Sequence, residues 1–192
     1  METSLDILRD KNTSTTEFRH AAMRLCDHLI ERLKRDLGKK QIDPKKVVFA
    51  IILRSAIAFS DAAVRAFPES PVGVLGLKRD ERTFYPHWYY ENLPPISEKS
   101  TIVILDPMLA TGGSAEAAVE RLMKRGADPN SIYFVGIVAA PEGFCRLSLL
   151  IPKENITLAS VDSRLDEHGM IVPGIGDFGD RYFGYVGRAI IA

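Results

Sequence analysis

Asp106-Pro-Met-Leu-Ala-Thr-Gly-Gly-Ser-Ala115 follows the apolar run Thr101-Ile-Val-Ile-Leu105 and precedes a segment, 114–125, whose apolar residues recur at helical spacing. Together these pieces predict a buried strand, an acidic glycine-rich loop and a helix N-terminus. Backbone N–H groups at residues 111–113 suit a phosphate monoester, because the helix dipole is positive there. Asp106 stands at the carboxyl end of the strand, where open α/β sheets bind ligands, and it suits ribose hydroxyls. The Gly-Lys-Ser/Thr ending of a nucleotide P-loop is missing, so the stretch predicts a sugar-phosphate site.

The rest of the chain repeats this alternation of strand and helix. Apolar runs at 47–53, 72–77, 132–140 and 156–161 alternate with helical patterns at 14–38, at 55–67 and after Pro141. Continuously apolar strands are typical of a parallel sheet that is buried on both faces. We therefore predict an α/β fold, a parallel sheet with helices on both faces.

Local signals set the expected element boundaries. Ser14 and Glu17 form a capping box for the first helix, and Gly38 is expected to end it. Residues 78–95 are expected to form a long irregular excursion of the kind that serves as a lid or binding loop. The aromatic residues at 84–90 would then form a lid or a subunit contact, and base stacking is a weaker third option.

Composition narrows the class of protein. A chain of 192 residues is most simply one domain, and its 25 basic and 25 acidic residues give no net charge. Zero net charge argues against a general nucleic-acid binder. Cys26 and Cys145 lie far apart and predict reduced thiols. The N-terminus does not resemble a signal peptide, and the apolar runs are too short to span a membrane, so we expect a soluble, cytoplasmic protein.

Two motifs carry a family resemblance. The string from Leu105 to Ser114 resembles the phosphoribosyl pyrophosphate (PRPP) motif of type I phosphoribosyltransferases, and its Pro-Met wording is similar to the uracil-specific branch. Glu167-His-Gly-Met-Ile-Val-Pro-Gly-Ile-Gly-Asp-Phe-Gly-Asp-Arg-Tyr-Phe-Gly184 resembles the uracil-binding segment of the uracil phosphoribosyltransferase family. Val138-Ala-Ala-Pro-Glu-Gly143 and Asn12-Thr-Ser-Thr15 resemble further signatures of that family.

The resemblance implies an architecture for the whole chain. It predicts a single phosphoribosyltransferase domain over 1–192, with a core at about 14–162 and a mobile loop at about 78–95. The C-terminal segment, about 163–192, would form a small hood that binds uracil.

The resemblance also assigns the PRPP site. Asp106, Arg54 and Arg79 would be the catalytic residues, with Asp106 on the ribose and the two arginines on the pyrophosphate. Residues 55–58, Ser-Ala-Ile-Ala, depart from the Ala-Gly-Leu-Gly usual in the family, and Ile57 would narrow this loop. Without the resemblance, Arg54 reads as a salt-bridged strand-end arginine and Arg79 as part of a solvated charge run. The full implied set of PRPP-binding residues is Arg54, Arg79, Asp106, Pro107, Met108, Leu109, Ala110, Thr111, Gly112, Gly113, Ser114 and Asp177.

For the base, the resemblance implies that backbone groups of Ile171, Gly176 and Phe178 pair with the uracil edge. Asp177 would contact uracil and hold the ribose or, through water, the Mg²⁺ delivered with PRPP. Residues 174–179 also match G-x-G-x-x-G, but Pro173 precedes them and no helix pattern follows, which excludes a dinucleotide-binding fingerprint.

The function that follows is conversion of uracil and PRPP to UMP and pyrophosphate in pyrimidine salvage. Two alternatives stay open: a regulatory relative that binds PRPP or UMP with little catalysis, and a phosphoribosyltransferase for another base. The resemblance further implies a homodimer or homotetramer, and some members of the family respond to GTP as an effector.

Overall fold

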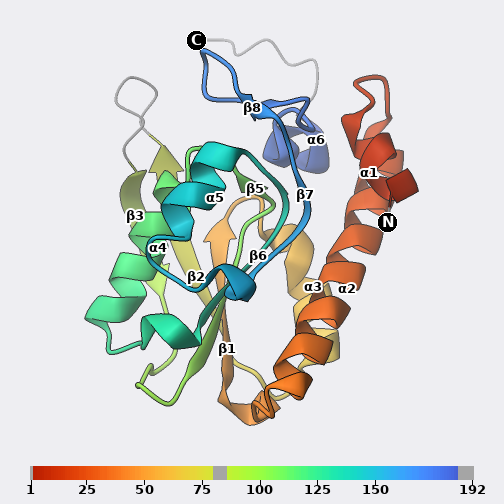
Figure 1. Ribbon diagram of the computed structural model, residues 1–192. Coiled ribbons are helices and arrows are strands. Elements are labelled where there is room, and N and C mark those ends of the chain that lie inside the picture. Colours follow the sequence, from red (N-terminus) through yellow and green to blue (C-terminus); the bar gives the residue numbers. More distant parts are fainter. Residues whose placement is uncertain (1, 80–85, 186–192) are drawn as a thin grey trace.

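The computed structural model describes residues 2–79 and 86–185, and Figure 1 shows its arrangement. Within this part of the chain, seven strands form one sheet in the order β3-β2-β1-β4-β6-β5, and β7 also pairs with β6. The β2–β3 pairing is antiparallel, and the other pairings in this sheet are parallel. The strands are β1 (Val47–Leu53), β2 (Val72–Arg79), β3 (Pro86–Asn92), β4 (Thr101–Leu105), β5 (Met108–Leu109), β6 (Ile132–Ala139) and β7 (Ile156–Val161).

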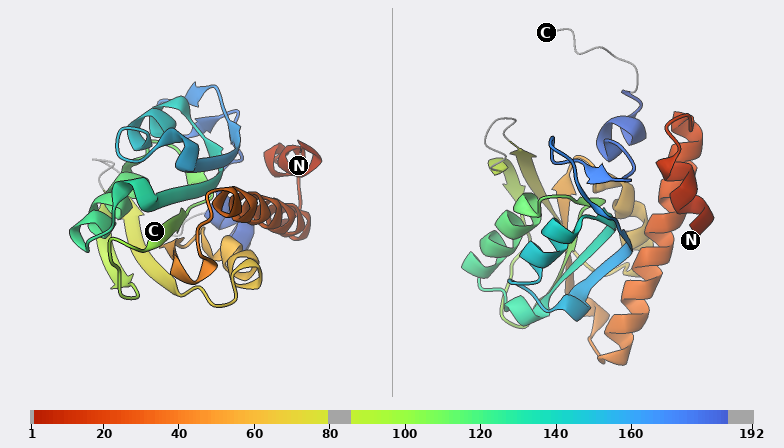
Figure 2. Two further views of the ribbon diagram at one scale, coloured as in Figure 1. Left: turned by 60° about the horizontal axis from the view of Figure 1, so that its bottom comes forward. Right: turned by 45° about the horizontal axis from the view of Figure 1, so that its top comes forward.

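Helices cover the sheet on both sides, as predicted. Helices α2 and α3 lie on one face, and α4 and α5 lie on the other (Figures 1 and 2). The α-helices are α1 (Glu2–Arg9), α2 (Thr15–Lys39), α3 (Ile57–Ala66), α4 (Gly113–Lys124), α5 (Pro141–Leu147) and α6 (Phe178–Phe183). Short 3-10 helices precede three strands: Pro44–Lys46, Pro129–Ser131 and Lys153–Asn155. None of the helices within 2–79 and 86–185 combines the length and apolarity needed to cross a bilayer.

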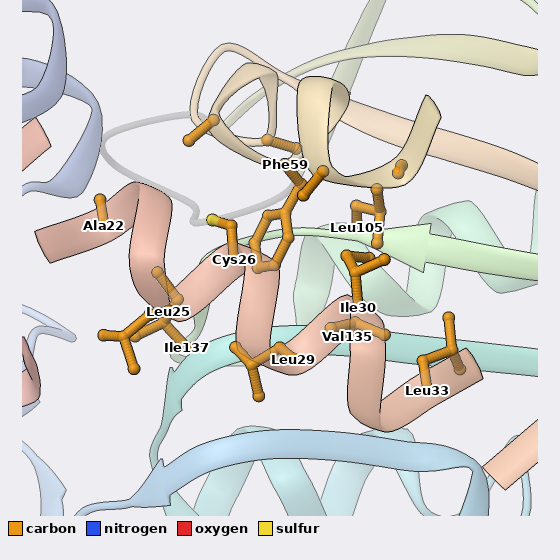
Figure 3. Packing of buried hydrophobic residues seen from close by; sticks show 14 of the residues in the cluster. Ala22, Leu25, Cys26, Leu29, Ile30, Leu33, Phe59, Leu105, Val135 and Ile137 are labelled. Carbon is orange, nitrogen blue, oxygen red and sulfur yellow. The ribbon is translucent and has the colours of Figure 1, made fainter. Parts of the chain in front are cut away.

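The core explains why the strands read as continuous apolar runs. Successive β1 residues alternate between the two faces: Phe49 and Ile51 pack with α2 and α3, whereas Ala50 and Ile52 pack with α4. Figure 3 shows the first of these layers, where Leu25, Cys26, Leu29 and Phe59 meet Leu105, Val135 and Ile137 from the sheet. Because both faces are buried, both sets of alternating positions must be apolar.

The carboxyl ends of β1 and β4 lie side by side at the centre of the sheet, where the strand order reverses. Strand β5 continues the line of β4 after an interruption at Asp106 and Pro107, and both strands pair with β6 in one common register. The Pro107 carbonyl accepts the N–H groups of Ile137 and Val138, at 2.9 and 3.1 Å. The sheet therefore holds the chain on both sides of Asp106.

The C-terminal part forms a hood beyond the carboxyl ends of the strands (Figure 1). It consists of α6 and a two-stranded antiparallel sheet of β8 (Arg164–Leu165) and β9 (Ile171–Val172). Residues 163–185 thus leave the main sheet, and residues 186–192 of the predicted hood lie outside the described residues.

Some sequence-based boundaries were wrong. Residues 78–95 are not one irregular excursion, because β2 extends to Arg79 and β3 pairs with it antiparallel; residues 80–85 lie outside the described residues. Gly38 does not end α2: Lys40 is the C-cap, and Gln41 takes the left-handed conformation at φ 56°. The prediction that no helix follows the glycine-rich stretch at 174–179 was wrong as well, because the six-residue helix α6 begins at Phe178.

Candidate active site

A cavity of about 650 Å³ opens at the carboxyl ends of β1, β2 and β4, with the hood at its rim. It brings together the strand-end segments, most of the predicted phosphate loop and part of the hood. Its described lining consists of Ile52, Leu53, Arg54, Ser55, Leu77, Lys78, Tyr89, Asp106, Met108, Leu109, Ala110, Thr111, Gly112, Gly113, Ser114, Ala115, Asp177 and Gly179.

The phosphate loop leads directly into a helix N-terminus. Gly112 is the N-cap of α4, with a left-handed φ of 78°, and no side chain among the described residues caps the helix there. The Gly113 N–H reaches the Thr111 hydroxyl only at 3.5 Å. The first-turn N–H groups and the positive end of the helix dipole are thus directed at the cavity, an arrangement that binds phosphate.

Helix α5 supports the phosphate loop from behind. A Cβ at Gly143 would lie 2.4 Å from the Ala110 carbonyl oxygen, so only glycine allows this close approach. Arg146 donates to the Thr111 carbonyl at 3.4 Å and forms an ion pair with Glu116 in α4. The Pro-Glu-Gly signature therefore has a physical role: it allows α5 to hold the backbone that surrounds the phosphate site.

Asp106 is a carboxylate in an unfavourable setting. Asp106 is partly buried at the cavity wall, and the loss of hydration raises its pKa to about 7, although the Met108 N–H acts in the opposite direction. A carboxylate poised near neutrality at a cavity wall is typical of functional sites. The Met108 N–H offsets this loss only in part, so Asp106 takes up a proton near neutral pH.

Arg54 follows β1 and turns toward the hood. The Leu53–Arg54 peptide is cis. The Arg54 Nη2 lies 3.1 Å from Asp180 Oδ1, and the guanidinium lies over the Phe183 and Tyr185 rings. About half of each charged side chain is exposed, 53% for Arg54 and 49% for Asp180. Arg54 therefore forms a salt bridge at the end of β1 and also lines the cavity, so both interpretations of this residue are compatible with the structure.

In the hood, the structure separates the predicted base-reading residues from the cavity wall. Asp177 lines the cavity, and its carboxylate accepts the Asp180 N–H at 2.8 Å. Ile171, Gly176 and Phe178 do not belong to the described lining. The Phe178 ring is buried against Phe18, at 5.4 Å between ring centroids, so its side chain is unavailable to a ligand. Any reading of a base by Phe178 therefore has to use its backbone.

Two predicted PRPP residues are placed differently. Pro107 does not line the described cavity, because its carbonyl is bonded into β6 instead. Arg79 ends β2, but its side chain lies outside the described part of the structure. Ile57 is 42% exposed and does not belong to the described lining.

Eight residues of the described lining are not among the predicted site residues: Ile52, Leu53, Ser55, Leu77, Lys78, Tyr89, Ala115 and Gly179. Lys78 and Tyr89 come from the paired strands β2 and β3. The sequence signal that could have identified them is the charged and aromatic stretch in which both lie, and which was predicted to be a loop. Gly179 meets Ser55 closely, since a Cβ there would be 3.0 Å from the Ser55 hydroxyl.

Metal binding by protein groups alone is poorly supported in this part of the chain. The described residues hold no group of three or more His, Cys, Asp or Glu side chains able to bind an ion. Asp106 and Asp177 are the carboxylates in the described lining. This donor set fits an ion that brings further oxygen ligands with it, such as phosphate oxygens.

A strand-end carboxylate, a phosphate loop at a helix N-terminus and a hood above a doubly wound sheet define the class of type I phosphoribosyltransferases. The family model for uracil phosphoribosyltransferase matches residues 1–185. The chain belongs to the uracil phosphoribosyltransferase family.

Individual relatives agree. The uracil phosphoribosyltransferase of Lacticaseibacillus paracasei is 42% identical, with 94% of this chain and 92% of that protein covered. The same enzyme of Geobacillus kaustophilus is 41% identical over the same shares. Among solved structures, the AQ2163 protein of Aquifex aeolicus is 31% identical with a TM-score of 0.83, covering 95% of this chain and 93% of that one. A Trypanosoma cruzi hypoxanthine phosphoribosyltransferase shares the fold alone, at 11% identity, a TM-score of 0.55 and coverage of 77% and 79%.

Proposed function

We propose that this protein transfers the phosphoribosyl group of PRPP to uracil and releases UMP and pyrophosphate. The observation that carries the proposal is the placement of Asp106 beside the α4 N-terminus, across one cavity from Arg54 and below the hood. Each part of PRPP requires a different partner, and this cavity supplies all three. The loop of N–H groups suits the phosphate, the carboxylate suits the ribose, and the guanidinium suits the pyrophosphate.

In the proposed reaction, the bond between ribose C1 and the pyrophosphate oxygen breaks, and its electron pair leaves with pyrophosphate. A bond from C1 to the base N1 forms, and the N1 proton is released to solvent. The loop from Ala110 to Ser114 binds the 5′-phosphate, and Asp106 accepts hydrogen bonds from the ribose hydroxyls. These contacts hold C1 against the base, so catalysis comes from orientation and from stabilising charge on the leaving group.

Arg54 supplies that charge stabilisation, together with Arg79 as the family resemblance implies. Its present pairing with Asp180 does not oppose this role, because an exposed ion pair of this kind contributes about 0–1 kcal/mol. A pyrophosphate offers bidentate, charge-assisted hydrogen bonds to the same guanidinium. We therefore expect PRPP to take Arg54 from Asp180 on binding.

The magnesium ion enters with PRPP in this proposal. When bound, Mg²⁺ would neutralise pyrophosphate charge, and Asp177 would hold it through water at the hood edge of the cavity. Ile171, Gly176 and Phe178 would present backbone N–H and C=O groups to uracil. A fixed set of backbone groups rejects a base with a different edge because it leaves polar groups unpaired.

The experiment that tests the function is product formation from Mg-PRPP with uracil, cytosine, orotate, adenine and hypoxanthine in parallel. UMP and pyrophosphate in equal amounts, from uracil alone, is the expected result. If another base were converted and uracil were not, that base would be the substrate instead of uracil. PRPP binding by calorimetry with no turnover of any base would refute the proposal and favour the regulatory alternative.

The same proposal covers the organisation of the protein. We expect one domain over 1–192 that works in the cytoplasm as a homodimer or homotetramer. The exposed Tyr90 on the edge strand β3 supports a subunit contact there, whereas the adjacent Tyr89 lines the cavity. Light scattering gives the oligomeric state, and activity measured with and without GTP tests the effector.

A further inference from the structure

A charged fork joins the N-terminal helix to the hood. The Arg9 guanidinium at the end of α1 donates to both carboxylate oxygens of Asp162, at 2.6 and 2.8 Å. The Asp162 side chain is 1% exposed and that of Arg9 is 23% exposed. Ser160 adds a third bond to the carboxylate, at 2.9 Å. A buried bidentate pair with its remaining acceptor sites filled is far more rigid than a surface ion pair.

This fork holds both backbone polar groups of one hood residue. The Gly174 N–H donates to Asp162 Oδ2 at 2.8 Å, and the Gly174 carbonyl accepts from Arg9 Nη1 at 3.1 Å. Gly174 has a left-handed φ of 64°, and a Cβ there would lie 2.1 Å from the Ile171 carbonyl oxygen. The turn between Ile171 and Gly174 is therefore closed tightly and fixed from outside by two side chains.

The electrostatics of Asp162 agree with this geometry. Burial alone would raise the pKa of Asp162, but the bonds from Arg9, the Gly174 N–H and Ser160 outweigh burial and hold the pKa below its ordinary value. Asp162 is thus a carboxylate at neutral pH, and the fork is fully formed under working conditions.

A second arginine fixes the next hood residue to the same helix end. Arg181, in α6, donates to the Ile175 carbonyl at 2.8 Å and to the Asp10 carbonyl at 2.6 Å. It also donates to the Leu8 carbonyl, and its guanidinium lies 4.2 Å from the centre of the Phe18 ring. Gly174 and Ile175 are therefore both bonded to arginines that lie at, or contact, the end of α1. These two residues lie in the sequence between Ile171 and Gly176, whose backbone groups are proposed to bind the base.

From these contacts we infer that Arg9 is a positioning residue for uracil: it sets the backbone of 171–178 through Gly174, although it lies outside the cavity wall. The inference rests on the proposed function, in which that backbone reads the base. Base recognition through fixed backbone groups is sensitive to small displacements, since a misplacement of 1 Å can change a rate by about 100-fold.

The experiment compares four variants in which the KM values for uracil and PRPP are measured separately. Arg9→Met removes the fork, and Arg9→Lys keeps the charge but loses the bidentate geometry. Arg9→Met leaves Asp162 buried and unpaired, so the double variant Arg9→Met/Asp162→Asn removes that charge and keeps the test valid if the single variant does not fold. Arg24→Met is the matched control, because Arg24 bonds to Ser4 at 3.3 Å in α1 and does not reach the hood.

We expect Arg9→Met and the double variant to raise the KM for uracil by about tenfold or more, and Arg9→Lys by a smaller factor. The KM for PRPP should stay within about twofold, and Arg24→Met should match the wild type. Calorimetry gives a readout without turnover: affinity for UMP should fall, while affinity for ribose 5-phosphate should not.

Parallel rises in both KM values, or an unchanged KM for uracil in a folded Arg9 variant, would overturn the inference. Failure of the proposed function looks different, because the wild-type protein itself would then form no UMP from uracil.

Discussion

Replacing Asp106 by Asn should make the protein more stable and, at the same time, poorly active. The loss of hydration at the cavity wall raises the pKa of Asp106 from 3.8 to about 7. The folded protein therefore holds the charged form against a desolvation penalty that the unfolded chain does not have. An amide at this position keeps the shape of the side chain and has no charge to desolvate.

The sign and size of the stability change follow from the coupling between proton binding and folding. Asp106 binds a proton more tightly in the folded state, so its contribution to stability is complete below pH 3.8 and is lost as pH rises through about 7. With these two pKa values the loss is about 2 kcal/mol at pH 5 and about 4 kcal/mol at pH 8. Asp106→Asn removes this dependence, and its advantage over the wild type should grow between these two pH values.

Urea unfolding of both proteins at pH 5, 6, 7 and 8 measures the difference. The change with pH is the decisive quantity, because burial of the amide adds a constant that does not vary with pH. Asp166→Asn is the control of opposite sign: the Met170 and His168 N–H groups lower the pKa of Asp166, so this variant should lose stability above the unfolded pKa. A pH-independent difference for Asp106→Asn would refute the reasoning.

The same titration should appear in the kinetics. If the ionised form of Asp106 binds the ribose, the KM for PRPP in the wild type should rise about tenfold as pH falls from 8 to 6. Asp106→Asn should show a low turnover at saturating PRPP and no such rise. Wild-type turnover in this variant would remove Asp106 from the mechanism.

Gly143→Ala places a methyl group 2.4 Å from the Ala110 carbonyl, so we expect the KM for PRPP to rise about tenfold with the KM for uracil unchanged, as steady-state kinetics would show. Gly112→Ala forces a side chain into φ 78° and should lower the free energy of unfolding by about 1–2 kcal/mol; an unchanged urea midpoint would contradict this. Asp180→Asn frees Arg54 from its ion pair and should tighten PRPP binding by up to about fivefold in calorimetry, and weaker binding would show that the pair assists the site.

The parts of the fold that could be predicted from the sequence are those with a clear pattern of apolar residues. The runs that became β1, β4 and β6 are buried on both faces, and their continuous apolar character reports that burial directly. Strand β3 was missed because it is an edge strand, in which polar residues such as His87 and Glu91 interrupt the pattern. Helices α1 and α6 are too short, at eight and six residues, for a 3.6-residue period to emerge.

The candidate site divides in the same way. Asp106 and the loop after it are contiguous, so local chemistry was enough to predict a phosphate and sugar site. The ion pairs of Arg54 with Asp180 and of Arg9 with Asp162 join residues 126 and 153 positions apart. Nothing in the local sequence signals such partners, because only the tertiary fold brings them together.

The uninterrupted register of β4 and β5 along β6 has a consequence for how this region can evolve. Side chains of a strand change face with each residue, so inserting or deleting one residue between Leu105 and Met108 would turn β5 over and break its pairing with Val138. Gly136 adds to this constraint, since a Cβ there would lie 2.7 Å from the Asp106 carbonyl. The sheet register therefore constrains the length of this two-residue step, in addition to the chemical constraint on Asp106 itself.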